Sequence, residues 1–342
     1  MAEEATGWGG ALWAAADLAT PMAIRVAATL RLADSIAAGT RTPEALATVV
    51  RADPDALERV MAHLVSSGVL TRTDGGFGLT AVGEQLRDDH PAGVRPWLDL
   101  EGAIGRADLC FTELLHTVRT GEPAFEAALG APFFSYMRDH PEDGAAFDGG
   151  MTRLSLDIID EALARYDFSV ARRILDVGGG RGHFAAAVLE AHSQLEGAVL
   201  DLPERIGAAD AYLRGRGLGE RCAAIGGNFF DTVPVGYDVH ILKWILHDWN
   251  DASCRQLLAQ CRAALPADGR LLVVELLLPD GAAADGRLRP AIQTDLFMLV
   301  NFADSRERSL DEYERLLGDC GFALEQAIAL PSSFSVLDFR PH

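Results

Sequence analysis

From Arg172 onward, the sequence alternates between short apolar segments and amphipathic segments, and this alternation limits the fold more than any other feature of the chain. Strands are predicted at 172–177, 197–201, 238–243 and 269–276, with helices near 182–192, 204–216, 251–264, 290–302 and 309–319. Alternating strands and helices form a parallel sheet with crossover helices. The segments 321–329 and 334–339 predict two further strands, in an antiparallel hairpin at one edge.

The first hundred residues have a different pattern. Residues 11–38 show helical apolar spacing, and Thr42-Pro43-Glu44 and Asp53-Pro54-Asp55 each place a capping residue before a proline, which predicts two more helix starts. Two short strands around Asp74-Gly75-Gly76 then predict a hairpin. Helices followed by a hairpin are typical of a winged helix, which serves either DNA binding or dimerisation.

Charge separates these two uses. The chain has 30 basic and 50 acidic residues, and residues 1–100 hold eight arginines against thirteen acids. The helix that would enter a DNA groove, near 55–67, offers only Arg59 and His63 as basic side chains. Phosphate backbones repel such a surface, so we expect dimerisation through apolar helices and no nucleic-acid partner.

Residues 101–168 are predicted to be helical and contain several aromatic side chains: Phe125, Phe133, Phe134, Tyr136 and Phe147. These rings would either line a pocket for a flat substrate or pack two domains together. The predicted organisation is therefore a winged-helix-like domain at 1–100, a helical segment at 101–168 and an α/β domain at 169–342.

Targeting and redox features are few. Acidic residues occupy the N-terminus, and Asp17 and Arg25 interrupt the first apolar stretch, so neither a signal peptide nor a membrane segment is expected. The five cysteines are scattered and form no CxxC, which indicates neither a disulfide framework nor a zinc site. We expect a cytoplasmic protein without a bound metal.

A glycine-rich turn, Asp176 to Gly182, joins the first predicted strand to the first helix, where doubly wound sheets bind ligands. Its G-x-G-x-G spacing differs from the G-x-G-x-x-G of dinucleotide sites. Asp201 ends the second strand, where a carboxylate can accept hydrogen bonds from ribose hydroxyls; the alternative is a helix cap before Pro203. Asn228 and Phe229 follow a further predicted strand, the third along the chain and the one before 238–243, and could bind and stack an adenine. These residues predict an adenosine pocket.

His247 lies just past the fourth strand, at the mouth of the same crevice. An imidazole with an ordinary pKa of about 6.5 suits a general base near neutral pH. Lys243, the only lysine of the chain, lies four residues earlier.

Five ordered strings carry a family resemblance: DVGGGRGHF, VLDLPE, GNFFDTVPVGYD, LKWILHDWND and GRLLVVELLLP. Together they resemble the S-adenosylmethionine-dependent small-molecule O-methyltransferases, which include plant caffeate and flavonoid enzymes and bacterial antibiotic-tailoring enzymes. The resemblance spans nearly the whole chain. It implies a Rossmann-like class I methyltransferase sheet with an N-terminal α-helical winged-helix dimerisation domain, and hence a homodimer.

The resemblance also implies residue roles. His247 would be the base, with the acids Glu275 and Glu307 beside it, and Glu275 would orient the imidazole; its alternative is a solvent-facing acid at a strand end. S-adenosylmethionine, which leaves as S-adenosylhomocysteine, would be bound by Asp176, Gly178, Gly180, Asp201, Leu202, Asn228, Phe229 and Lys243. The aromatic acceptor would contact Phe133, Met151, Trp244, Asp248 and Asn301.

Asn228 departs from the family pattern, which usually has Asp, so we expect altered adenine contacts. Ser309-Leu310-Asp311-Glu312 predicts a capping box without chemistry. The expected activity is O-methylation of an aromatic, polyketide-like natural product. The alternatives are C- or N-methylation, decarboxylation or hydroxylation on the same scaffold, and a non-enzymatic ligand-responsive DNA binder.

Overall fold

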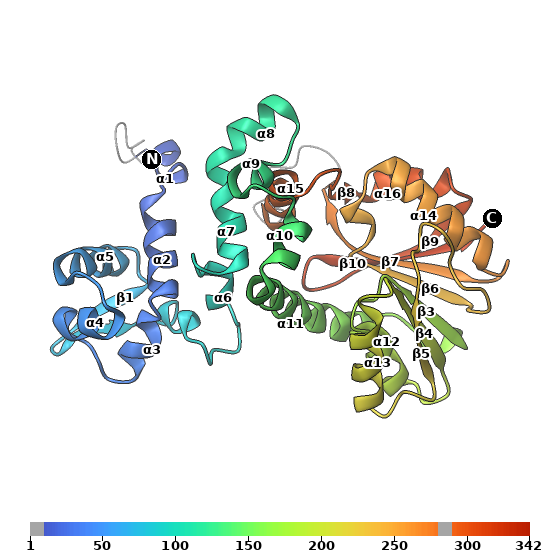
Figure 1. Cartoon of the computed structure of the whole chain (residues 1–342), viewed down its shortest axis with the longest axis horizontal. Helices are drawn as coiled ribbons and strands as arrows, with labels where there is room; N and C mark the ends of the chain where they lie inside the picture. Colours follow the sequence, from blue (N-terminus) through green and yellow to red (C-terminus); the bar gives the residue numbers. More distant parts are fainter. Residues whose placement is uncertain (1–9, 280–288) are drawn as a thin grey trace, which may run out of the picture. The chain divides into compact units, whose positions relative to one another are not determined.

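A computed structural model describes residues 10–279 and 289–342 of the chain (Figure 1). The acidic start, residues 1–9, lies outside the described residues. The chain forms two compact units: the first comprises residues up to 112 together with 134–150, and the second comprises 113–133 and 151–342. The predicted domain boundaries at 100 and 168 stay a prediction.

The first unit contains the predicted helices and hairpin. Its elements are α1 (Ala11–Ala15), α2 (Ala19–Thr29), α3 (Leu32–Ala37), α4 (Pro43–Val50), α5 (Pro54–Ser66), β1 (Leu70–Thr73), β2 (Gly76–Leu79), η1 (Gly83–Leu86), α6 (Arg95–Leu98) and α7 (Ala103–Leu109). Thr42 and Asp53 cap α4 and α5, with proline at the first helical turn, as predicted. Gly76 is required between the strands, since it has φ of 123° and a Cβ there would lie 2.2 Å from the Arg41 carbonyl oxygen.

Helices fill the middle of the chain, as expected: η2 (Cys110–Glu113), α8 (Leu114–Thr120), α9 (Ala124–Leu129), α10 (Phe133–Asp139), α11 (Pro141–Arg165) and η3 (Phe168–Val170). The aromatic residues of this stretch divide between the two units. Phe125 and Phe133 are buried in the second unit, with ring centroids 5.0 Å apart. Tyr136 belongs to the first unit and stacks on His140.

A sheet of eight strands forms the centre of the second unit. The strands are β3 (Arg173–Val177), β4 (Glu196–Asp201), β5 (Cys222–Gly226), β6 (Val239–Lys243), β7 (Arg270–Leu278), β8 (Arg308–Ser309), β9 (Phe322–Ala329) and β10 (Phe334–Pro341). The main order is β5-β4-β3-β6-β7-β10-β9, and the two-residue β8 pairs with β7. Strands β3 to β7 run parallel. The last two strands form the predicted antiparallel edge hairpin.

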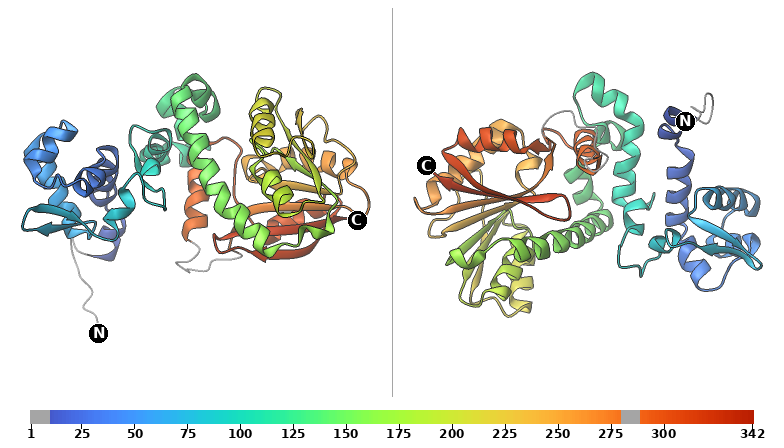
Figure 2. Two further views of the ribbon diagram at one scale, coloured as in Figure 1. Left: turned by 90° about the horizontal axis from the view of Figure 1, so that it is seen from below. Right: turned by 180° about the vertical axis from the view of Figure 1, so that it is seen from behind.

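Helices cover both faces of this sheet (Figures 1 and 2). Side chains from α11, α12 (His183–Ala191) and α13 (Ile206–Gly215) pack on one face, and those from α14 (Asp251–Ala264) and α16 (Leu310–Gly318) pack on the other. The remaining helices of the unit are η4 (Leu246–Asp248) and α15 (Arg289–Asn301). Since Ile174 faces the first cluster and Leu175 the second, the strands are buried on both sides. The α/β prediction is confirmed.

His240 interrupts this apolar pattern in β6. Its side chain is fully buried, and neither ring nitrogen has a hydrogen-bond partner among the described residues. Its neighbours across the sheet are Leu175 on β3 and Leu271 on β7. Burial alone lowers the pKa of His240 to about 3. The imidazole is therefore neutral in the folded protein.

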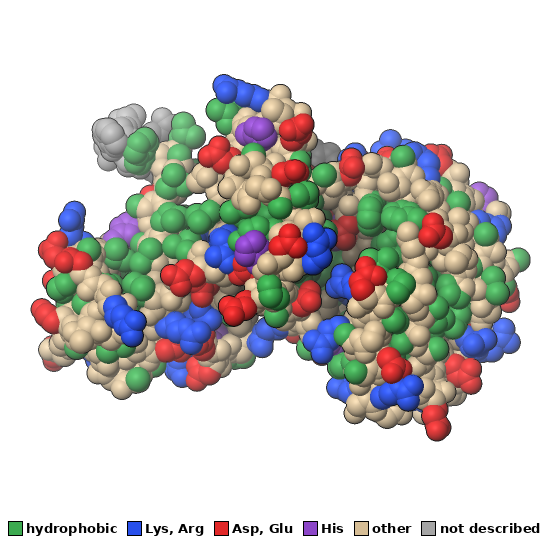
Figure 3. All heavy atoms as spheres, viewed as in Figure 1, with side chains coloured by type: hydrophobic (Ala, Val, Ile, Leu, Met, Phe, Trp, Pro, Cys, Tyr) green, Lys and Arg blue, Asp and Glu red, His purple; other side chains and the backbone are tan. Residues whose placement is uncertain are grey.

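Acidic and basic side chains are interspersed over the face drawn in Figure 3. Four of the five cysteines are buried, and none forms a disulfide. Among the described helices, none combines the length and the apolar character that crossing a bilayer requires.

Candidate active site

The glycine-rich turn follows β3 at the place where the chain order of the sheet reverses. From β3 the chain continues to β4 and β5 on one side and returns to β6 on the other, and such a switch point is where open α/β sheets bind ligands. The Gly180 amide donates to Oδ2 of Asp201 at 2.8 Å, and the Leu202 amide donates to Oδ1 at 2.7 Å. The turn and the acid at the end of β4 are thus joined directly.

Three glycines of this turn adopt the left-handed conformation: Gly178 with φ of 72°, Gly180 with φ of 57° and Gly182 with φ of 79°. A Cβ on Gly178 would lie 2.5 Å from Cδ1 of Ile245, so the turn packs against the segment that follows β6. Beside Gly180, no heavy atom of the described residues lies within 4 Å of a Cβ position. The backbone of Gly180 is therefore open to a ligand.

Asp176 lies on β3 just before this turn and is 1% exposed. Its Oδ2 accepts a hydrogen bond from the Ala185 amide in the first turn of α12. Burial raises the pKa of Asp176, and the Lys243 ammonium works in the opposite direction.

The segment predicted to contact adenine forms a tight turn. Oδ1 of Asn228 accepts a hydrogen bond from the Phe230 amide at 3.0 Å. Phe229 packs edge-on against Phe230 and Trp249, with ring centroids 4.8 and 6.2 Å away. Leu202, predicted to be part of the same pocket, is exposed.

Lys243, at the end of β6, contacts α11. Its Nζ lies 2.9 Å from Oγ of Ser155 and 5.0 Å from the centre of the Trp244 ring. Burial lowers the pKa of Lys243, opposed by the charges of Asp176 and Glu275. Ser155 could not be found from the sequence, because it meets Lys243 only through the fold. Met151 lies one turn before Ser155 on the same helix and is partly buried.

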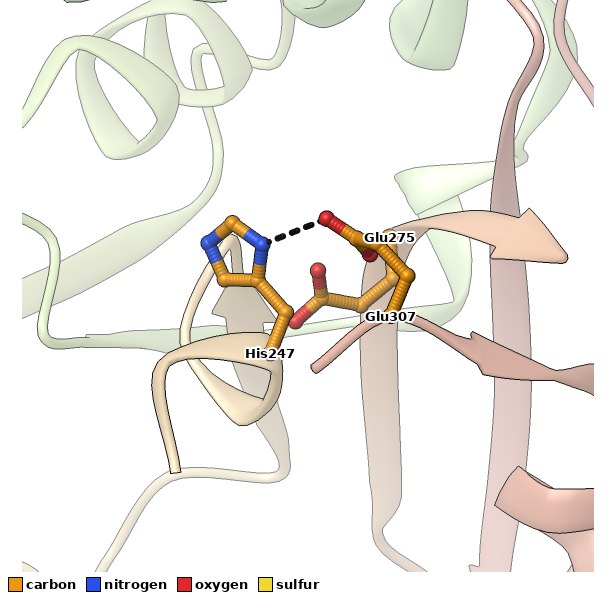
Figure 4. Close-up of side chains that lie close together, drawn as sticks. All are labelled: His247, Glu275 and Glu307. Atoms are coloured by element: carbon orange, nitrogen blue, oxygen red, sulfur yellow. Dashed lines mark hydrogen bonds and ion pairs between the residues drawn. The ribbon is translucent and has the colours of Figure 1, made fainter. Parts of the chain in front are cut away.

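His247 lies in the short helix η4, directly after β6, and its side chain is 10% exposed. Its Nδ1 is 2.9 Å from Oε1 of Glu307 (Figure 4). Its Nε2 is 3.4 Å from Oδ1 of Asp248. The Trp244 ring is parallel to the imidazole, 6.0 Å away, and Trp244 itself has φ of 56°. Such a backbone conformation is strained for a residue with a side chain, and strain of this kind concentrates at functional sites.

Glu275 was expected to orient the imidazole of His247, but it binds the backbone of the turn instead. It is fully buried on β7, which excludes the solvent-facing alternative. Its Oε1 accepts hydrogen bonds from the amides of Ile245 and Leu246 at 3.1 and 2.9 Å. Glu275 therefore fixes the backbone of the turn, and the carboxylate hydrogen-bonded to the imidazole is Glu307. The physical reason is the position of η4, whose first amides point toward β7.

The acids around His247 control its proton affinity. Burial alone would lower the pKa of His247, but Asp248, Glu275 and the hydrogen bond to Glu307 together raise it above the ordinary value. Burial raises the pKa of Glu275, and the nearby acids add to this effect while His247 opposes it. These groups interact strongly and titrate as one unit.

His247, Glu275 and Glu307 also offer ligand atoms that all lie within 4.8 Å of one another, a grouping that could hold a metal ion. The sequence did not indicate this, since the three residues are far apart along the chain. Their observed hydrogen bonds already use Nδ1 of His247 and one oxygen of each carboxylate.

The residues predicted to contact the acceptor contribute both apolar and polar groups. The Phe133 ring packs between Phe125 and Phe302, with centroids 5.0 and 4.6 Å away. Asn301 on α15 is buried, and its Nδ2 donates to the Phe297 carbonyl. Neither Oδ1 of Asn301 nor Nε1 of Trp244 has a partner among the described residues. One acceptor and one donor thus remain for a ligand.

Known proteins share this architecture. Residues 111–323 match the family model of the O-methyltransferase domain, and residues 13–88 match that of the O-methyltransferase dimerisation domain. The chain is 44% identical over 318 residues to 2,7-dihydroxy-5-methyl-1-naphthoate 7-O-methyltransferase of Streptomyces carzinostaticus, covering 92% of this chain and 93% of the relative. A crystal structure of an O-methyltransferase from neocarzinostatin biosynthesis, in complex with S-adenosylmethionine and 2-hydroxy-5-methyl naphthoic acid, is 41% identical with a TM-score of 0.84, covering 97% of this chain and 98% of that one.

The chain belongs to the S-adenosylmethionine-dependent O-methyltransferases. The methyltransferase is also 39% identical over 335 residues to aclacinomycin 10-hydroxylase of Streptomyces purpurascens, covering 94% of this chain and 88% of that relative. The match of residues 13–88 favours dimerisation over DNA binding for the winged helix.

The structure of the methyltransferase fits this cofactor. The open backbone at Gly180 and the Asp201 carboxylate beside it suit the close approach and hydroxyl recognition that an adenosine requires. Gly178 joins this pocket to the turn that carries His247, through its contact with Ile245.

Proposed function

We propose that this methyltransferase methylates a hydroxyl of an aromatic, polyketide-like natural-product intermediate, with His247 as the general base. The observation that carries the proposal is the 2.9 Å contact between Nδ1 of His247 and Glu307, in a turn that packs on the glycine-rich loop. Relatives named for hydroxylated naphthoates support the substrate class.

The bound cofactor supplies a methyl group that is already activated by its positive sulfonium. A phenol has a pKa of about 10 and is a weak nucleophile while protonated. Because a carboxylate only accepts hydrogen bonds, Glu307 keeps the hydrogen of the neutral imidazole on Nδ1, and Nε2 presents its lone pair to the acceptor hydroxyl. His247 then takes the phenolic proton as the oxygen attacks the methyl carbon.

The acids stabilise the imidazolium that this step forms. Asp248 lies 3.4 Å from Nε2, Glu307 accepts from Nδ1, and Glu275 holds the turn from β7. The remaining acceleration comes from alignment of oxygen, methyl carbon and sulfur, which requires a fixed acceptor. Phe133 and Trp244 supply flat apolar surface for that purpose, and Asn301 supplies a hydrogen-bond acceptor.

We further propose that the enzyme is a homodimer formed through its first unit. The match of residues 13–88 to a dimerisation domain supports this. Apolar side chains on and near α1 and α2 are exposed in the single chain, with Leu12 84% and Leu18 72% exposed. Covering them in a dimer would remove that apolar surface from water.

The test compares wild type with His247→Ala, and uses His140→Ala, at an exposed position of the first unit, as the control. S-adenosylhomocysteine binding is measured by calorimetry, and turnover is measured with a panel of hydroxynaphthoates and other phenols. We expect all three proteins to bind the product and only His247→Ala to lose methylation.

Mass spectrometry and NMR spectroscopy of the products decide between reaction classes, because O- and C-methylated products have the same mass. A methyl ether supports the proposal. A C- or N-methylated product, a decarboxylated product, or a hydroxylated product like that suggested by the hydroxylase relative would replace it. If His247→Ala turns over as fast as wild type, a group other than His247 takes the phenolic proton.

A further inference from the structure

Three consecutive residues, Arg306 to Arg308, contact the turn that carries His247. The Arg306 amide donates to the His247 carbonyl oxygen at 2.9 Å. The Glu307 carboxylate is hydrogen-bonded to the imidazole. The Arg308 side chain donates to backbone carbonyls of the turn, and neither the cofactor site nor the general-base mechanism uses it.

The Arg308 guanidinium is 1% exposed and binds the turn before and after His247. Its Nη1 donates to the Leu246 carbonyl at 2.9 Å, and its Nη2 donates to the Trp249 carbonyl at 2.8 Å. Its Nε and Nη2 also donate to Oδ1 of Asp251, at 3.1 and 2.8 Å, at the start of α14. One side chain therefore connects both ends of η4 to the next helix.

Physical chemistry explains why this turn needs such a partner. Buried carbonyls require hydrogen bonds, and the Leu246 carbonyl has one long helical bond, from the Trp249 amide at 3.3 Å. The Cys254 thiol, a weak donor, lies 3.3 Å from the Leu246 carbonyl oxygen and 3.4 Å from that of Trp249, so the guanidinium is the strong donor to both. The planar guanidinium donates in several fixed directions at once, which an ammonium does not. In addition, β8 pairs Arg308 with Leu277 on β7, the strand that carries Glu275. Backbone pairing and hydrogen bonds thus connect Arg308 to the turn of His247 and to the strand of Glu275.

We propose that Arg308 is a positioning residue for methyl transfer: it holds the carbonyls of Leu246 and Trp249 so that the His247 imidazole stays in line with Glu307 and the acceptor hydroxyl. The role in catalysis rests on the proposed function of His247. The contrasting possibility is that Arg308 only stabilises the fold.

Arg308→Met and Arg308→Lys test the proposal, with Arg221→Met as the matched control. Arg221 also donates to several backbone carbonyls, those of Leu189, His192, Ser193 and Leu195, but it lies beside the start of β4 and β5, whereas η4 follows the carboxyl end of β6. Both substitutions remove an arginine that ties backbone segments together. Only Arg308→Met removes one from the turn that carries the base.

Two readouts separate positioning from stability. The first is the titration of His247 by NMR of histidine-labelled protein, its signal assigned by its absence in His247→Ala. The groups facing this imidazole are Asp248, Glu275 and Glu307. We expect Arg308→Met to move the His247 titration toward lower pH, because a displaced imidazole loses its bond to Glu307. In Arg308→Lys, His247 should titrate at a pH between those of Arg308→Met and wild type.

The second readout is single-turnover methylation together with S-adenosylhomocysteine binding. We expect Arg308→Met to slow methyl transfer about 100-fold, the effect of a misplacement of about 1 Å, while product affinity changes less than about twofold. Arg308→Lys should recover part of the rate, and Arg221→Met should lower only the melting temperature.

An unchanged His247 titration in Arg308→Met, with a rate no lower than that of Arg221→Met, would overturn the positioning role. If Arg308→Met does not fold, the titration of Arg308→Lys decides by the same criterion. Absence of methylation by wild type across the phenol panel would overturn the proposed function instead, and the NMR titration would still decide whether Arg308 positions His247.

Discussion

His240 offers a stability prediction whose size follows from its surroundings. It is a fully buried imidazole on β6 without a hydrogen-bond partner in the described structure, between Leu175 and Leu271 of the neighbouring strands. Replacing it by leucine keeps a similar volume and removes two buried nitrogens. We expect His240→Leu to stabilise the protein by about 2 kcal/mol at pH 7, the usual cost of an unsatisfied buried polar group.

The same substitution should remove a pH dependence. The pKa of His240 is about 3 in the folded protein, against about 6.5 in the unfolded chain. Below pH 6.5 the unfolded chain therefore binds a proton that the folded protein does not, and wild type loses stability as the pH falls. At pH 5 this loss amounts to about 2 kcal/mol at 1.36 kcal/mol per pH unit, so the advantage of His240→Leu should grow to about 4 kcal/mol.

Urea unfolding of both proteins at pH 7 and pH 5, followed by circular dichroism, measures the effect. The difference between the two proteins at each pH cancels the other titrating groups, which both share. His140→Leu, at an exposed position, serves as the control for replacing a histidine by leucine. If the advantage of His240→Leu does not change with pH, the imidazole is protonated or hydrogen-bonded in the folded state and the reasoning fails.

Two further predictions concern the active site. Glu307→Gln removes a charge that raises the pKa of His247, so the pH at which kcat/KM rises should move down, because the base is active when neutral; kcat should fall about tenfold or more. A profile that stays in place or moves up would contradict the assignment of Glu307. Asn228→Asp should tighten S-adenosylhomocysteine binding a few-fold by calorimetry, because Oδ1 of Asn228 already accepts from the Phe230 amide and an aspartate would add a second, charged acceptor oxygen for adenine. Weaker binding by Asn228→Asp would show that Nδ2 makes the favourable contact.

The sequence was most informative where structure is local. The proline-capped helices and the hairpin at Asp74-Gly75-Gly76 depend on neighbouring residues, and the structure confirms them. The capping box at Ser309 and Glu312 is likewise present. The alternation after Arg172 also predicted the sheet, because a period that changes from strand to helix is visible without knowledge of tertiary contacts.

Contacts between distant segments could not be predicted in the same way. The sequence indicated Glu275 and Glu307 as neighbours of His247, but their hydrogen bonds depend on which way the amides of η4 point. The two-residue strand β8 exists only through its pairing with β7. Arg308 lies beside a predicted site residue, yet its role depends on carbonyls of a turn far away along the chain.

Lys243 gives the molecule one more property. As the only lysine of the chain, at the end of a strand that lies between β3 and β7, it is the single bond at which a lysine-specific endoprotease can cut. Proteases require a locally unfolded segment, and a central strand supplies one only when the sheet opens. The rate of cleavage into fragments 1–243 and 244–342 therefore measures how often the sheet opens next to the ligand crevice, and no label has to be introduced. A ligand seated there should slow the cut in proportion to its occupancy.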